Sequence, residues 1–181
     1  MTEFSEDLLL RFQAGDSSAF AELVDEFAPR LKGFFLRKGL QNSTAEDLSQ
    51  NVFVRLYNTS ERYQARGKLD AYCFQIAHNI FIDHCRRNKV AVNSDEVPEQ
   101  ADPRQQSAEE VEQLDSASKL REILAQQDDS TRQLIELAVL QQLSYADVSD
   151  ILEIPVGTVK SRVFYALRRM RESFSRYKND L

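Results

Sequence analysis

Residue types that usually carry out chemistry are few in this chain of 181 residues. The two histidines and the two cysteines lie close together, at Cys73, His78, His84 and Cys85. A helix turns by about 100° per residue, so His78 and His84 would point about 240° apart and could not share a metal ion. We find no spaced nucleophile and base, no carboxylate pair and no glycine-rich phosphate loop. The sequence therefore predicts no enzyme, no metal site and no cofactor.

The stretch Ser144–Arg171 instead carries residues suited to nucleic-acid recognition. It is typical of two helices joined by a tight turn. Ser144 with Asp147 predicts a capping box at the start of the first helix. Pro155 should end that helix, because proline disfavours helical geometry in the residue before it. The second helix should then run from about Val156 to beyond Arg171.

The two sides of this second helix differ in chemistry. One side is apolar, with Leu167 at its edge, and comprises Val159, Val163, Ala166 and Met170. The other side is polar and aromatic, with Thr158 beside it and cations at both edges: Gly157, Lys160, Ser161, Arg162, Phe164, Tyr165 and Arg168. In a major groove, cations at the edges meet phosphates and the strip between them meets base edges. A helical hairpin with a solvated basic face is the alternative, but an exposed Phe164 argues against it.

Charge is unevenly distributed along the chain. The net charge is −6, yet residues 89–112 alone carry 2 cations and 7 anions, and Ile154–Lys178 carries 7 cations and 1 anion. The distribution of charge, rather than its total, indicates a DNA-binding segment. The sequence contains no run of about 18 apolar residues, so it predicts no membrane span. The acidic N-terminus is unlike a signal peptide, and two cysteines twelve residues apart on one predicted helix cannot bond to each other. We therefore expect a reducing, cytoplasmic location.

Helices are predicted through the first half of the chain. A short helix over Ser5–Gln13 should end at Gly15, and a longer one, capped by Asp16 or Ser17, should reach Lys38 and stop at Gly39. Pro29 should kink or divide that helix. The next helix should start at Asn42–Thr44, where Ser43 with Glu46 and Thr44 with Asp47 could both form capping boxes.

The helix Ala45–Tyr57 has an inner apolar stripe of Ala45, Leu48, Val52 and Leu56. Its opposite face carries Asp47, Gln50, Asn51 and Val54. An apolar Val54 among carboxylate and amide groups suggests a protein partner, although single exposed apolar residues are common.

A polar loop over Asn58–Lys68 precedes a helix over Leu69–Arg87. The predicted inner stripe of that helix is Leu69, Tyr72, Cys73, Ile76 and Ile80, and the helix finishes with Arg86 and Arg87. An aromatic residue and cations before a basic helix could stack on unpaired bases. A solvated loop beside a core helix explains the same residues equally well.

The second half divides into a linker and a helical domain. Residues 90–113 contain Pro98, Pro103 and the acidic cluster, and have the composition of an extended or disordered linker. Amphipathic helices are predicted over Leu114–Gln126 and over Thr131–Gln142, the second capped by Ser130. The predicted fold is all-α, with two small helical domains joined by an acidic flexible linker, and the C-terminal domain is a four-helix domain with a helix-turn-helix. The predicted boundaries are 1–89, 90–113 and 114–181.

Three motifs in this order resemble the bacterial RNA polymerase sigma factors of the sigma-70 family, most closely the extracytoplasmic-function (ECF) group. Ala45–Tyr57 is similar to the region 2 helix that docks on the polymerase clamp. Ile76–Arg87 is similar to the helix that reads and melts the −10 element, and Ile154–Arg162 to the −35 recognition helix of region 4. Some positions depart from the family pattern: Asn51 stands where Glu is usual, Tyr72 where Trp is usual, and Glu153 where a turn Gly is common.

The resemblance implies a protein that binds core RNA polymerase and directs promoter-specific transcription initiation. It implies polymerase binding through Asp47, Gln50, Asn51 and Val54. It implies −10 contacts from Tyr63, Arg66, Lys68, Asn79, Arg86 and Arg87, and −35 contacts from the outer face of the last helix. It also implies an anti-sigma protein as a partner and no membrane insertion.

Two other functions remain open at this point. A helix-turn-helix repressor or activator would bind a palindrome as a dimer and would need no polymerase. A helical interaction protein would not bind DNA. Neither accounts for the motifs at Ala45–Tyr57 and Ile76–Arg87.

Overall fold

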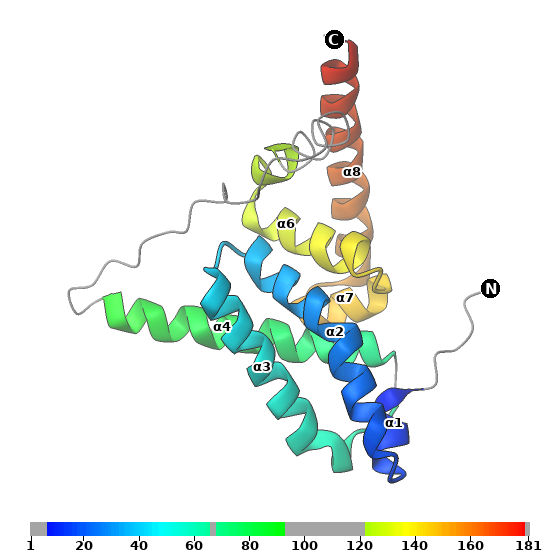
Figure 1. The fold of residues 1–181 in the computed structure, drawn as a ribbon. Helices are drawn as coiled ribbons and strands as arrows, with labels where there is room; N and C mark the ends of the chain where they lie inside the picture. Colours follow the sequence, from blue (N-terminus) through cyan, green and yellow to red (C-terminus); the bar gives the residue numbers. More distant parts are fainter. Residues whose placement is uncertain (1–6, 66–67, 93–121, 180–181) are drawn as a thin grey trace. The chain divides into compact units, whose positions relative to one another are not determined.

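The computed structural model describes residues 7–65, 68–92 and 122–179, and these residues are helical throughout, with short connections (Figure 1). The chain divides into two compact units, Met1–Pro103 and Arg104–Leu181. The all-α prediction with two helical domains is confirmed. Among the described helices, none is long and apolar enough to cross a membrane.

The first unit begins with α1 (Leu8–Gln13) and α2 (Ser17–Arg37), each started by an aspartate. The Asp7 side chain accepts hydrogen bonds from Leu9 N and Leu10 N, and Asp16 accepts one from Ser18 N. Gly15 and Gly39 follow the two helices with φ of 100° and 83°, a conformation that glycine adopts without a Cβ penalty. The predicted ends of these helices are therefore close to the observed ones.

Pro29 does not divide α2, which continues without a break to Arg37. Proline removes one backbone donor, so the carbonyl four residues earlier, on Asp25, loses its helical partner. Pro29 and Asp25 are both exposed, and water can take the place of that donor. The predicted division is wrong because the missing hydrogen bond lies on the solvent side of the helix.

Helix α3 (Asn42–Thr59) starts without the predicted capping boxes. Its N-cap is Gln41, whose side chain makes no capping hydrogen bond. The carboxylate of Glu46 instead accepts hydrogen bonds from Lys32 Nζ at 2.7 Å and Asn42 Nδ2 at 3.1 Å. The contact with Lys32 joins α3 to α2, and it explains why Glu46 does not turn back to cap its own helix.

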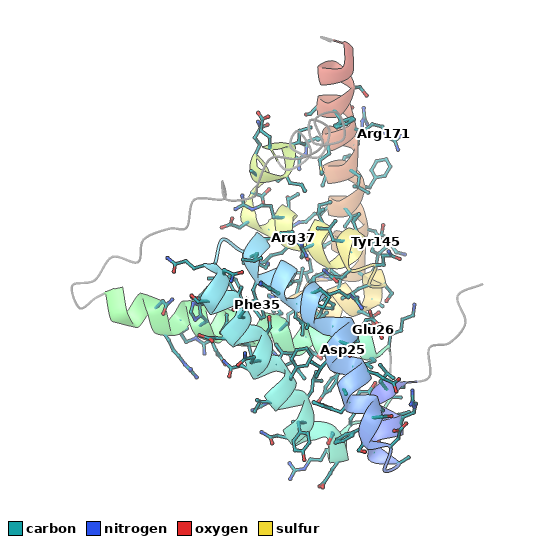
Figure 2. The ribbon with its side chains drawn as sticks, viewed as in Figure 1. Asp25, Glu26, Phe35, Arg37, Tyr145 and Arg171 are labelled. Carbon is teal, nitrogen blue, oxygen red and sulfur yellow. The ribbon has the colours of Figure 1, made fainter. Side chains whose placement is uncertain are left out.

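The core of the first unit forms where α2, α3 and α4 (Leu69–Val92) pack together. From α2, Phe34 and Phe35 are fully buried, and Phe35 is labelled in Figure 2. The predicted inner stripe of α4 is partly wrong: Phe74 and Ala77 are fully buried, whereas Tyr72, Ile76 and Ile80 are only half-buried. The buried side of α4 is shifted because the phenyl ring of Phe74 packs against Phe34 of α2, with ring centroids 5.7 Å apart.

Arg30 links α2 to α4 through charge and aromatic contacts. Its guanidinium lies 4.8 Å from the ring centroid of Phe27 and 5.2 Å from that of Phe74. The same group forms an ion pair with Asp70 Oδ1 at 2.6 Å. Cation–π contacts of this geometry are favourable when partly desolvated, so Arg30 holds the start of α4 against α2.

The second unit contains a described helical turn at residues 122–125, then α6 (Asp129–Ile135), a π-helical segment (Glu136–Leu140), α7 (Tyr145–Leu152) and α8 (Val156–Asn179). Asp128, not the predicted Ser130, caps α6: its carboxylate accepts from Thr131 N at 3.0 Å and from Ser130 Oγ at 2.6 Å. These hydrogen bonds hold the pKa of Asp128 well below its usual range. Ser130 is thus a donor to the cap rather than the cap itself.

The π-helical segment was not predicted. The backbone N–H of Gln141 donates to Glu136 O, five residues earlier, and the Gln141 side chain donates to Glu136 Oε1 at 2.9 Å. Both side chains are buried, and a buried carboxylate needs such a donor. The pair explains why the predicted helix over Thr131–Gln142 changes its winding near its end.

The first three residues of the predicted linker, 90–92, are helical rather than extended, because α4 continues to Val92. The rest of the linker, residues 93–113, lies outside the described residues.

Glu153, between α7 and α8, has a left-handed backbone with φ of 54° and ψ of 41°. A side chain in this region costs roughly 1–2 kcal/mol, a cost that glycine avoids. We expect Glu153→Gly to raise the free energy of unfolding by about 1 kcal/mol, measured by urea unfolding followed by circular dichroism.

The matched control is Asp150→Gly at an exposed position inside α7, which should lower the stability because glycine weakens a helix interior. Equal effects of the two glycines would contradict the assignment of strain to Glu153.

Candidate nucleic-acid and polymerase interfaces

The turn between α7 and α8 is held by a small set of hydrogen bonds. Ser144 Oγ accepts from Asp147 N at 3.1 Å and donates to Asp147 Oδ2 at 2.6 Å, which confirms the predicted cap at the start of α7. Two hydrogen bonds span Glu153: Ser149 Oγ donates to Ile154 O at 2.6 Å, and Ile154 N donates to Ser149 O. Pro155 O then accepts from Thr158 N at 2.8 Å and starts α8. The two helices are thereby fixed as a helix-turn-helix.

Burial of one side of α8 determines which side faces outward. Val159, Val163 and Ala166 are almost fully buried, and Met170 continues the same stripe. Ala166 and Met170 pack in a cluster with Ile123 and Ile135, so α8 is held against α6 and the preceding helical turn as well as against α7. The predicted apolar side of this helix is confirmed, with Leu167 exposed at its edge.

The outward side of α8 presents aromatic and cationic side chains. Phe164 is 62% exposed and Tyr165 59% exposed, and their rings meet edge to face with centroids 5.5 Å apart. Lys160, Ser161, Arg162 and Arg168 are also exposed, and Thr158 is half-buried beside them. Arg171 follows on the same helix and is labelled in Figure 2. A continuous polar and aromatic strip with cations at its edges is therefore accessible along two turns of α8.

Two side chains of this strip have partners on their own helix. Ser161 Oγ donates to Thr158 O at 3.1 Å, and Arg168 Nε donates to Glu172 Oε1 at 3.0 Å. The Arg168–Glu172 pair is exposed at both ends, and such pairs contribute only about 0–1 kcal/mol. Arg168 can therefore exchange Glu172 for a nucleic-acid phosphate or base at little cost.

The outer face of α3 is accessible as predicted. Asp47, Gln50 and Asn51 are exposed, and Val54 is 57% exposed. The opposite stripe of Ala45, Leu48, Val52 and Leu56 is buried against α2 and α4. The four outward residues thus form one surface, which we call the α3 face.

The predicted −10 residues separate into three groups. Lys68, Asn79, Arg86 and Arg87 are exposed, and Asn79 and Arg86 lie on one side of α4 because they are seven residues, or two turns, apart. Arg86 also forms an ion pair with Asp83 at 3.6 Å, and both side chains are exposed. Arg66 lies outside the described residues.

Tyr63 does not fit a base-stacking role, because its side chain is only 8% exposed. Its hydroxyl donates to Asp7 Oδ2 at 2.6 Å, and its ring packs on Tyr72 with centroids 4.9 Å apart. Burial, with the Asp7 hydrogen bond second, raises the pKa of Tyr63 far above its usual range. The Tyr63 ring is therefore not accessible to an unpaired base in this structure, because Asp7, 56 residues away in the sequence, binds its hydroxyl.

The two histidines of α4 face different surroundings. His78 Nδ1 is buried without a hydrogen-bond partner in the described structure, whereas His84 Nε2 lies 3.0 Å from Asn88 Nδ2. Burial, and secondarily the charge of Lys38, lowers the pKa of His78 to about 4. Within the described residues, no three metal-ligating side chains come together. His78 is therefore neutral near pH 7 and half-buried, with its Nδ1 atom inside the fold.

The half-buried His78, with its lowered pKa, makes the stability of the first unit depend on pH. His78 binds a proton near its ordinary pKa of 6.5 in the unfolded chain and only near 4 in the folded chain. The folded state therefore has its full stability above pH 6.5 and loses stability as the pH falls from 6.5 toward 4. One proton gives a slope of at most about 1.4 kcal/mol per pH unit. Urea unfolding at a series of pH values should show a flatter profile for His78→Gln than for the wild type.

The matched variant for this test is His84→Gln, on the same helix, which should behave as the wild type. A wild-type profile for His78→Gln would show that the pH dependence arises elsewhere.

Comparison with known proteins places both units in one family. Residues 23–90 match the family model for sigma-70 region 2, and residues 118–170 match the model for sigma-70 region 4. The chain is 30% identical over 167 residues to the ECF RNA polymerase sigma factor RpoE of Cereibacter sphaeroides, covering 88% of each chain. It is 33% identical over 171 residues to the ECF RNA polymerase sigma factor SigK of Mycobacterium tuberculosis, covering 91% of each chain.

The fold is also similar to a solved structure, the sigma factor RpoE in complex with the anti-sigma factor NepR from Bartonella quintana. The TM-score is 0.65 at 24% identity, over 86% of this chain and 96% of that one. Sigma factors are generally non-enzymatic, DNA-binding regulators. With both family regions in order and two curated relatives matched over most of their length, the chain belongs to the ECF group of the sigma-70 family and is a sigma factor that directs promoter-specific transcription initiation.

Proposed function

We propose that this sigma factor binds core RNA polymerase through the α3 face, reads the −35 element with α8 and contacts the −10 element with exposed residues on and before α4. The observation that best supports the proposal is the exposed side of α8, where Phe164 and Tyr165 are exposed between cations while the opposite side is buried. An apolar ring among charges is costly in water and gains when a partner covers it.

On α8 the proposal separates two kinds of contact. Lys160 and Arg162, at the edges, bind phosphates and fix the position of the helix in the major groove. Thr158, Ser161, Tyr165 and Arg168 can hydrogen-bond to base edges, and Phe164 can pack against a thymine methyl group. Arg168 gives up its contact with Glu172 when DNA is present.

For the −10 element, we propose Lys68, Asn79, Arg86 and Arg87 as contacts. Their exposure along α4 supports this role. Asn79 has donors and an acceptor for a base edge, and the three cations suit the backbone of an opened strand. Tyr63 is withdrawn from this set, and Arg66 stays a prediction from the sequence.

Polymerase binding by the α3 face is supported by its composition. Asp47 brings a charge, Gln50 and Asn51 bring amide groups, and Val54 brings an exposed apolar side chain. Interfaces of this kind combine an apolar centre with a polar rim.

We also propose the boundaries 1–89 for region 2, 90–113 for the acidic linker and 114–181 for region 4. The segment 91–117 lies between the two family matches, which supports a connecting role. Residues 89–112, with 2 cations and 7 anions, suit a cationic channel of the polymerase. The protein performs no reaction of its own in this scheme and acts in the cytoplasm, where promoter DNA and polymerase are found.

An anti-sigma protein is part of the proposal as well. The Bartonella quintana structure holds its sigma factor together with an anti-sigma factor. By analogy, a protein of that kind covers the interfaces of this chain until it is needed. A helix-turn-helix repressor is not favoured, because it leaves the region 2 match unexplained.

Charge reversal on the α3 face should abolish binding to core polymerase. Asp47→Arg with Gln50→Ala places a cation where an anion fits, which costs several kcal/mol at an interface. A loss of about a hundredfold or more in affinity is expected, since about 1.4 kcal/mol gives tenfold. Core pull-down and circular dichroism measure binding and fold together.

The control for this variant is Asp25→Arg, the same charge reversal at an exposed position of α2 (Figure 2). It should retain binding. Wild-type pull-down by the double variant would remove the α3 face from the proposal.

Substitutions of the phosphate-binding and the base-binding residues on α8 should have different effects on DNA binding. Lys160→Ala should weaken all promoters alike and reduce the salt slope by about one unit. Ser161→Ala, Phe164→Ala and Tyr165→Ala should flatten preference at particular −35 positions, by about 1–3 kcal/mol for a good base contact. The assay is binding of holoenzyme to a randomised −35 library at two salt concentrations.

The opposite pattern would contradict this docking. If Lys160→Ala changes the preferred sequence while the three strip variants leave it unchanged, α8 enters the groove in another rotation.

A further inference from the structure

We propose that α1 is a clasp that holds the segment Ser60–Ala65 in place at the entry to α4, and that Asp7 and Gln13 are positioning residues for promoter opening. The inference rests on the proposed −10 role of the residues that follow this segment. It concerns a part of the chain that precedes the region 2 family match, which begins at residue 23.

Gln13 makes the first contact of the clasp. Its side-chain Nε2 donates hydrogen bonds to two backbone carbonyls of the segment, Ser60 O and, at 2.9 Å, Tyr63 O. These carbonyls belong to the first residue of the short 3₁₀ helix η1 (Ser60–Arg62) and to Tyr63, which directly follows it. One amide group at the end of α1 therefore fixes both ends of the turn that follows α3.

Asp7 makes the second contact, from the other end of α1. Its Oδ1 atom caps α1 by accepting from Leu9 N at 3.0 Å and from Leu10 N at 3.2 Å. Its Oδ2 atom accepts from the hydroxyl of Tyr63 at 2.6 Å. A single carboxylate thus links the folding of α1 to the position of Tyr63.

Tyr63 passes this restraint on to α3 and α4. Its ring packs on Tyr72 of α4 with centroids 4.9 Å apart. The Tyr72 hydroxyl lies 2.9 Å from Thr59 Oγ1 at the end of α3. The described residues on both sides of the entry to α4 are therefore connected through one set of contacts.

Helix α1 is itself held against the rest of the first unit by buried side chains and ion pairs. Leu9 is fully buried, and Leu8 nearly so. Arg11 forms ion pairs with Asp16 Oδ2 at 2.6 Å and with Glu22 Oε2 at 2.9 Å, which join α1 to α2. Because α1 has only six residues, these contacts rather than its own length keep it folded.

The position of the segment matters because Lys68, a proposed −10 contact, lies five residues after Tyr63. A chain that is already ordered loses less entropy when it binds than one that must be ordered by its partner. The clasp would thus favour capture of opened −10 bases without touching DNA itself. Its loss should slow promoter opening and leave −35 binding and core binding unchanged.

The test uses the full-length protein with three variants. Gln13→Ala removes the bonds to the two carbonyls. Tyr63→Phe removes only the hydroxyl and keeps the ring against Tyr72. Asp7→Asn keeps a good helix cap but weakens the bond to Tyr63. The matched control is Gln41→Ala, an exposed glutamine whose side chain makes no capping hydrogen bond.

Two measurements are made on each variant: hydrogen exchange of the amides in residues 60–65, and the rate of promoter opening by reconstituted holoenzyme followed by permanganate footprinting. We expect exchange to increase and opening to slow by about two- to tenfold, the range that one hydrogen bond supports. Asp7→Asn and Tyr63→Phe together should have little more effect than either alone, because they break the same contact.

The readouts separate the clasp from the proposed −10 role. Unchanged exchange in the three variants overturns the clasp. Faster exchange with an unchanged opening rate also overturns it, provided that Lys68→Ala slows opening. If Lys68→Ala has no effect either, the −10 assignment itself has failed, and the positioning role fails with it. If the variants lose −35 binding or core binding to the same extent as they lose the rate of promoter opening, α1 only stabilises the fold. That result also overturns the proposal.

Discussion

Burial of one narrow stripe on each functional helix is the constraint on which the rest of this structure depends. Val159, Val163 and Ala166 must face the core of the second unit, and this requirement fixes the rotation of α8. Phe164 and Tyr165 are then exposed because no other side remains for them. The same reasoning applies to α3, where burial of Ala45, Val52 and Leu56 leaves Asp47, Gln50 and Val54 outward. In both units the core selects the face that is offered to a partner.

Polar contacts then set the ends and joins of these helices. Arg30 holds α4 against α2 by pairing with Asp70 between two phenyl rings, and Asp7 links α1 to Tyr63. In the second unit, the left-handed Glu153 and the hydrogen bond between Ser149 and Ile154 set the turn of the helix-turn-helix. Sigma factors are generally non-enzymatic regulators, so their function depends on the accurate placement of binding surfaces. These contacts place them.

Periodicity alone was sufficient to predict both faces of α3 and α8, because each pattern depends only on residues within one helix. Contacts distant in sequence were not predictable in this way. Tyr63 is buried by Asp7, and the stripe of α4 shifts toward Phe74 because Phe34 and Arg30 of α2 pack there. The prediction of helix caps failed where several candidate residues lie close together in the sequence. At the start of α6, Asp128 rather than Ser130 accepts the capping hydrogen bond from Thr131 N. The buried Glu136–Gln141 pair gives no periodic signal at all.

As a sigma factor, this chain gives core RNA polymerase its promoter specificity. Transcription in vitro from a fragment library, by core polymerase with and without the purified protein, tests it most directly. New transcripts should start at a limited set of sites that share one −35 and one −10 sequence at a fixed spacing, and they should be absent without the protein. Specific DNA binding by the protein alone, with no new transcripts when core polymerase is added, would contradict it.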